Sequence, residues 1–156
     1  MKKVKNNLKQ HQSIVADILI DLLEHDETVR FTAQGPSMFP MIRSGARVSV
    51  KPLRQETRIP RGTIIFFRHH NRLILHRLIR HDPRTNICIT TGDAALHGTQ
   101  AVTLPDIIGI GCTVTHGTKK RRLDSLPARH LGLLLFYARP LRRLTDKIWF
   151  QHRRNL

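Results

Sequence analysis

A serine flanked by two prolines stands in the stretch Gly35-Pro36-Ser37-Met38-Phe39-Pro40. It directly follows residues 29–33, whose alternating pattern predicts a β-strand. Glycine permits unusual backbone angles and proline fixes its own, so the Ser37 hydroxyl is expected at a stiff turn. A nucleophile needs such a setting, but an ordinary tight turn with a serine has the same sequence. The stretch is therefore informative only together with the residues downstream of it.

Five further short segments downstream are predicted as strands. They are residues 47–51, 63–67, 73–79, 87–91 and 107–114. The unbroken apolar character of 63–67 predicts burial on both of its faces. The residues through Gly98 and Pro105 are expected to form a loop. Many short strands separated by glycine, proline and polar turns predict a mainly β fold, a small barrel or sandwich.

Amphipathic helices are predicted near both ends of the chain. Apolar residues recur at helical spacing over 6–25. A second helical pattern runs over 128–150, and Pro140 is expected to kink or split it. The 156 residues suffice for one domain with terminal extensions. We therefore divide the chain into an N-terminal helix (1–28), a body (29–116) and a basic helical extension (117–156).

Positive charge is concentrated at the C-terminal end. The whole chain has a formal net charge of +16, of which residues 119–156 carry +9, while residues 1–30 are neutral overall. Such a segment favours an anionic partner, either phospholipid head groups or nucleic acid, unless it is only a solvated face. One side of the 128–150 helix is apolar and the other is cationic, which fits a helix in a membrane interface. The cationic side consists of Arg129, Arg139, Arg142, Arg143 and Lys147. A helix docked on the body with its arginines in water is the alternative.

Several classes of protein are disfavoured. No secretory signal is predicted, and the apolar run 131–138 is far shorter than the roughly 20 residues that span a bilayer. The protein is therefore expected in the cytoplasm. Cys88 and Cys112 lie in separate apolar runs and are expected to be small hydrophobes rather than a disulfide. Neither they nor the ten histidines show metal-ligand spacing, so no metal or cofactor is expected.

Six landmarks in order resemble the signal peptidase and SOS-repressor self-cleavage superfamily of serine peptidases. The likeness covers about residues 29–114. It implies a small coiled β-barrel, flanked here by the two terminal helices, and makes the body over 29–116 a peptidase domain. The landmarks are residues 35–40, 44–50, 61–67, 75–79, 90–93 and 108–110.

The resemblance implies roles for three residues. Ser37 would be the nucleophile and His76 its general base, since histidine stands where endoplasmic-reticulum, archaeal and sporulation-type signal peptidases have it. Imidazole can remove a serine proton near neutral pH. Asp93 would fix the imidazole tautomer and stabilise the cation. Arg77 is expected on the strand face opposite His76, because strand side chains alternate.

The rest of the nucleophile box would support the oxyanion. Gly35, Pro36, Met38 and Pro40 are its other members. The backbone N–H of Ser37 would donate to the oxyanion of the tetrahedral intermediate. Proline has no N–H, so a second donor must come from elsewhere.

Three departures from the family pattern keep alternatives open. Ala46 and Thr63 stand where the family usually has acidic residues, and no second aspartate follows Asp93. The membrane-spanning anchor usual in the family is also not expected at either end. A non-catalytic interaction module with a decayed site is therefore one alternative. A repressor-like DNA-binding regulator is another, but residues 1–30 are neutral and too short for a helix-turn-helix, so a nucleic-acid partner is not expected.

The leading hypothesis is a signal-peptidase-like serine endopeptidase. Its partner would be a leader or precursor peptide with small residues before the cut. The basic C-terminal helix could hold the enzyme at the inner face of an anionic membrane.

Overall fold

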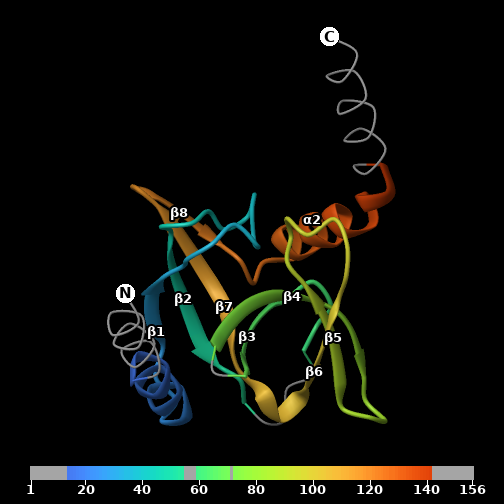
Figure 1. The fold of residues 1–156 in the computed structure, drawn as a ribbon. Coiled ribbons are helices and arrows are strands. Elements are labelled where there is room, and N and C mark those ends of the chain that lie inside the picture. Colours follow the sequence, from blue (N-terminus) through green and yellow to red (C-terminus); the bar gives the residue numbers. More distant parts are fainter. Residues whose placement is uncertain (1–13, 55–58, 71, 142–156) are drawn as a thin grey trace, which may run out of the picture.

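The computed structural model describes residues 14–54, 59–70 and 72–141, and eight antiparallel strands form one curled, half-barrel sheet (Figure 1). The strand order is β1-β2-β7-β3-β4-β5-β6, and β8 pairs with β7. Residues 14–24 are helical, η1 is a short 3-10 helix (Leu104–Asp106) and α2 is an α-helix (Leu126–Tyr137). The strands are β1 (Val29–Thr32), β2 (Arg47–Pro52), β3 (Ile64–His69), β4 (Arg72–Asp82), β5 (Ile87–Thr91), β6 (Gln100–Thr103), β7 (Ile107–His116) and β8 (Lys119–Arg122).

The predicted mainly β fold is confirmed, and each of the six predicted strands has a counterpart. Two strands were not predicted. β6 lies within the segment that was expected to be a loop. It was not predicted because its four residues, which pair with β5 alone, show too little alternation. β8 consists of four exposed cations, which carry no apolar signal. Its pairing with β7 depends on a two-residue turn in which Gly117 has a φ of +56°.

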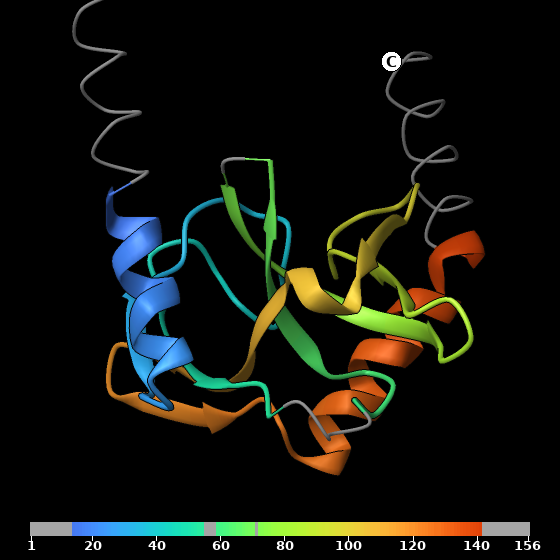
Figure 2. The same ribbon diagram turned by 90° about the horizontal axis from the view of Figure 1, so that it is seen from below.

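The two helices lie on different parts of the sheet. In both views the N-terminal helix lies by the β1–β2 side, and α2 lies by the β4–β5 side (Figures 1 and 2). Helix α2 begins after Ser125, whose hydroxyl accepts a hydrogen bond from the Ala128 N–H. It breaks at Ala138, close to the predicted site, because Pro140 has no N–H to continue the ladder. The remainder of both predicted helices, 6–13 and 142–150, lies outside the described residues.

Two apolar clusters fill the curl of the sheet, and β3 contributes to both. Ile64 and Phe66 lie in the first cluster, whereas Ile65 and Phe67 lie in the second. This confirms the predicted burial of both faces. The first cluster also contains Leu23, Met38, Ile42, Val48, Val50, Val114 and Leu123.

The packed body continues beyond residue 116. β8 pairs with β7, and the side chain of Leu123 is buried in the first cluster. The three-part division of the chain itself stays a prediction. Cys88 is buried and Cys112 half-buried, and both thiols are free. None of the helices within the described ranges is long and apolar enough to cross a membrane.

Candidate active site

Ser37 lies exposed on the loop that joins β1 to β2, the light-blue segment between β8 and α2 in Figure 1. Gly35 enters this loop with a φ of +87°, which glycine adopts readily. Its N–H donates to the hydroxyl of Ser44 over 3.2 Å. Met38, the next residue after the serine, is buried in the first apolar cluster. The loop is thus anchored on both sides of an exposed hydroxyl.

The two prolines of the box lie on the exposed side of the same loop. The Pro36 carbonyl accepts a hydrogen bond from the Phe39 N–H over 3.0 Å, which closes a turn around Ser37. The peptide bond before Pro40 is cis. All members of the predicted nucleophile box therefore belong to one compact turn.

The residues that follow β5 contact the backbone of Ser37. The Ala94 N–H donates to the Ser37 carbonyl over 2.9 Å. Gly92 packs so closely on Ser37 that a Cβ atom at this position would clash with the same carbonyl oxygen. A glycine is therefore required where the end of β5 meets the nucleophile loop.

His76 lies in the middle of β4. Arg77 pairs with Thr91 across the β4–β5 ladder, and continuing this antiparallel register places His76 opposite Gly92. His76 is half-buried with its ring edge-on to Phe67, 5.9 Å between centroids. Burial lowers the pKa of His76 below its ordinary value of 6.5. The imidazole is therefore neutral at pH 7, the form that can accept a proton.

The predicted role of Asp93 is wrong. Both of its carboxylate oxygens accept hydrogen bonds from Arg77, each over 2.7 Å, and both side chains are buried. Arg77 projects to the side of β4 opposite His76, as expected from strand alternation. Among the described residues, the buried Nδ1 of His76 has no hydrogen-bond partner. Asp93 therefore holds Arg77 and does not orient the imidazole.

A small hollow adjoins Ser37. Its volume is about 160 Å³, and its walls come from the nucleophile loop, β1, β3 and the first half of β4. Most of its lining is apolar: Phe31, Ala33, Met38, Ile42, Phe66, Leu73, Ile74 and Leu75. A hollow of this size next to a hydroxyl suits one small aliphatic side chain.

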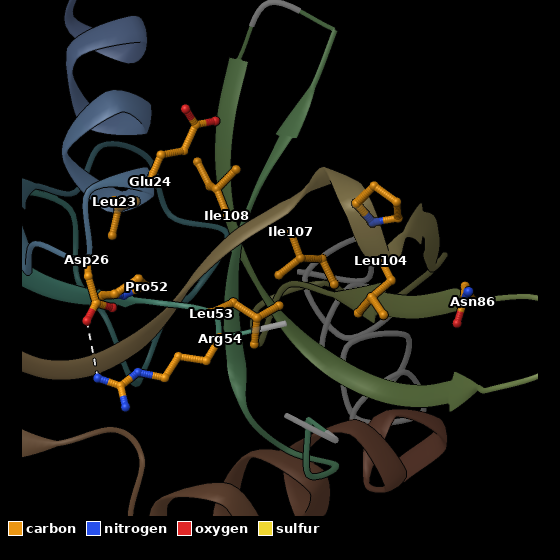
Figure 3. A pocket seen from close by; sticks show the side chains of 11 residues that line it. Leu23, Glu24, Asp26, Pro52, Leu53, Arg54, Asn86, Leu104, Ile107 and Ile108 are labelled. Carbon is orange, nitrogen blue, oxygen red and sulfur yellow. Dashed lines mark hydrogen bonds and ion pairs between the residues drawn. The ribbon is translucent and has the colours of Figure 1, made fainter. Parts of the chain in front are cut away.

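A larger hollow of about 950 Å³ shares no lining residue with the first (Figure 3). Its walls include Leu53, Ile107 and Ile108, and the exposed ion pair between Arg54 and Asp26 lies at its side, 3.2 Å between N and O. None of the predicted site residues faces it. Choosing the candidate site by the volume of the hollow alone would therefore select a region away from the predicted site residues.

Metal ligands are not grouped in the part of the chain that the structure describes, where no three His, Cys, Asp or Glu side chains could share an ion.

The sequence matches the family model for Peptidase S24-like proteins over residues 3–109. The chain belongs to this family. The superfamily resemblance of the six landmarks is thereby confirmed, and the S24-like match includes Ser37, His76 and Asp93. A comparison with curated proteins finds no match.

Two arginines of this S24-like protein matter more to the site than the sequence indicated. Arg77 was placed correctly, but its pairing with Asp93 was not predicted. The sequence signal for this pairing was weak. It consisted of an arginine directly after the predicted base His76 and of a single acid, Asp93, at the end of the landmark 90–93. Arg139 was expected on the cationic side of the C-terminal helix, which is wrong: it is buried, only 5% exposed. No sequence signal distinguishes it from its exposed neighbours.

Replacing Gly92 with alanine should lower the free energy of unfolding by about 1–3 kcal/mol, the usual cost of overpacking. The new methyl group would meet the Ser37 carbonyl, a backbone atom that cannot rotate away. Urea unfolding monitored by circular dichroism measures this loss. Gly111→Ala is the matched control, since its Cβ would lie 3.3 Å from a side-chain methyl of Ile64. Equal costs for both variants would contradict the close contact at Ser37.

Proposed function

We propose that this S24-like protein is a serine endopeptidase of signal-peptidase type, with Ser37 as nucleophile and His76 as general base. The observation that carries the proposal is the Gly92 contact. It places the Ser37 backbone against the residue that follows β5, and continuing the β4–β5 register puts the half-buried His76 opposite that residue.

The chemistry needs only these two side chains and the backbone. Ser37 Oγ bonds to the scissile carbonyl carbon while its proton passes to His76. The Ser37 N–H donates to the oxyanion. His76 then protonates the leaving amine as the C–N bond breaks, and water hydrolyses the acyl-enzyme with the same base. Burial lowers the pKa of His76 and so keeps the ring in the neutral form that accepts the proton.

The proposed substrate is a leader or precursor peptide with a small residue before the cut. The hollow beside Ser37 supports this, since it is small and apolar. The first half of β4 also supports it. Residues 72–76 pair with β3 on one side, while the β5 ladder begins only at Arg77. An extended peptide can add to this open edge and place a side chain by Leu73 and Leu75.

A fluorophosphonate probe tests the proposed nucleophile directly. A working Ser37 would displace fluoride and form a P–O bond, and peptide mapping would locate the adduct on residues 35–38. Labelling that requires native protein supports the proposal. If native protein stays unlabelled and cleaves no member of a peptide library, the endopeptidase is refuted. The fold would then serve as an interaction module, which the missing partner at His76 Nδ1 already favours as the second candidate.

The labelling rate should fall as pH decreases through the pKa of His76, with a midpoint below 6.5. The neutral imidazole is the active form and acid converts it to the cation. Burial disfavours the cation, so the loss must occur at lower pH than for a free histidine. Rates measured between pH 4.5 and 8 give the midpoint, and His116→Gln should leave it unchanged. A midpoint at or above 6.5 would contradict this assignment.

We further propose that the protein is cytoplasmic and binds an anionic membrane at its inner face. The supporting surfaces lie in the C-terminal segment. β8 exposes four cations. One side of the C-terminal helical segment exposes Leu131, Leu134, Tyr137 and Leu141. Cations with exposed apolar residues are what an anionic bilayer surface attracts. The predicted cationic residues 142, 143 and 147 lie outside the described residues.

Sedimentation with vesicles checks this proposal. Vesicles of phosphatidylglycerol and phosphatidylcholine should bind the protein, and pure phosphatidylcholine should bind it at least about tenfold more weakly. Leu134→Glu should weaken binding, whereas Ile87→Glu, at an exposed apolar residue on β5, serves as the control. Equal binding to both vesicles would count against an anionic partner. Salt-sensitive binding to DNA instead would favour the regulator hypothesis.

A further inference from the structure

Helix α2 packs against residues that lie next to the candidate site. Its Gly132 lies against the Arg77 guanidinium so closely that a Cβ atom there would overlap it. The Arg129 carbonyl oxygen similarly approaches Gly62, 2.7 Å from where a Cβ would stand. The helix thus covers the buried pair of Arg77 and Asp93, although α2 lies beyond the residues matched by the family model.

Arg139 extends this contact to the loop after β5. Its guanidinium donates to the Thr91 hydroxyl, to the Gly92 carbonyl over 3.1 Å and to the Gly98 carbonyl over 3.3 Å. It also stacks on Phe136, 4.6 Å from the ring centroid. One planar guanidinium therefore ties both ends of the 92–98 loop to the helix. A lysine, with a single ammonium group, could not reproduce this fork.

The same loop holds the nucleophile. Gly92, which accepts from Arg139, packs on the Ser37 backbone, and the Ala94 N–H donates to the Ser37 carbonyl. Arg139 is thus connected to Ser37 through the backbone of Gly92 and through the short chain from Gly92 to Ala94. Because a displacement of about 1 Å at a reacting atom can cost 10²-fold in rate, support of this loop affects catalysis directly.

We propose that Arg139 is a positioning residue: it fixes the 92–98 loop and thereby sets where Ser37 stands relative to His76. The effect of Arg139 on the reaction rate of Ser37 rests on the proposed function. Its effect on the rigidity of the 92–98 loop does not, because that effect needs no catalysis. Arg61 offers a matched comparison because it also ties α2 to the body, donating to the Ile79 carbonyl and the Tyr137 hydroxyl without touching 92–98.

The test compares Arg139→Met, Arg139→Lys and Arg61→Met in the full chain at a temperature where each is folded. Fluorophosphonate labelling per folded molecule should fall at least tenfold in Arg139→Met, less in Arg139→Lys, and stay unchanged in Arg61→Met. The midpoint of the pH profile should not move, because His76 is untouched. A residue that only stabilised the fold would lower the melting temperature without changing the rate per folded molecule.

Amide hydrogen exchange separates failure of this proposal from failure of the proposed function. Exchange at residues 92–98 and 35–39 should accelerate at least tenfold in Arg139→Met but not in Arg61→Met, whether or not the protein is a peptidase. If wild type is never labelled yet exchange changes as expected, only the endopeptidase is refuted. Unchanged exchange in Arg139→Met overturns the positioning role.

Discussion

Peptide hydrolysis should fall by roughly 10³-fold or more when Ser37 is replaced with alanine. The variant keeps the His76 base and the backbone N–H, but no atom remains to form the acyl-enzyme. Because Ser37 is exposed, the free energy of unfolding should change by less than about 0.5 kcal/mol. The measurement is cleavage of a peptide library with small residues before the cut, together with urea unfolding of the same preparation.

Ser49→Ala is the matched control for this variant. Ser49 lies half-buried on β2, outside the nucleophile loop, and its removal should leave hydrolysis unchanged. Cleavage that persists in Ser37→Ala would assign the activity to another residue or to a contaminant. Loss in both variants would indicate damage to the fold rather than to the reaction.

Asp93→Asn should lower the free energy of unfolding by about 3–5 kcal/mol, the cost of breaking a buried ion pair from one side. Arg77 has no exposed surface and donates to both Asp93 oxygens and to the Gly62 carbonyl. An amide can replace only one of the two acceptors and none of the charge. The guanidinium would then remain buried without its counter-charge. Urea unfolding followed by circular dichroism measures the loss.

An exposed ion pair supplies the comparison. Asp26 pairs with Arg54 at 3.2 Å, with 61% and 79% of their side chains exposed, so Asp26→Asn should cost no more than about 1 kcal/mol. Asparagine also tolerates the φ of +65° at this position. The double variant Arg77→Met with Asp93→Leu should recover much of the lost stability, since it leaves no unpaired charge. A cost at Asp93 as small as that at Asp26 would show that the buried pair contributes little.

Most of the fold was predictable because most of its strands carry their own local pattern. The alternation before Ser37 indicates which face of β1 is buried, and the unbroken apolar run of β3 indicates that both of its faces are buried. β8 escaped prediction because its pairing partner, not its own four cations, makes it a strand. Likewise the stiff turn at residues 35–40 was predictable from six consecutive residues, since it is closed by neighbours in the chain. Its assignment as a nucleophile box depended on the landmarks downstream.

The partners of the charged residues were not predictable in this way. Asp93 could pair with either His76 or Arg77, and only the direction of the strand side chains decides between them. Arg139 lies 47 residues after Gly92 in the sequence, and no periodicity links the two. Burial of a charge depends on which helix face meets the sheet, which is a property of tertiary packing.

The glycine at position 132 bears on how the protein responds to ionic strength. Glycine costs about 1 kcal/mol in a helix interior, but here it lets α2 approach until water is excluded from Arg77 and Asp93. Dissolved ions screen exposed charges and hardly reach a buried pair. High salt should therefore weaken attraction between the cations of β8 and an anionic surface, while the ion pair behind Ser37 keeps its strength.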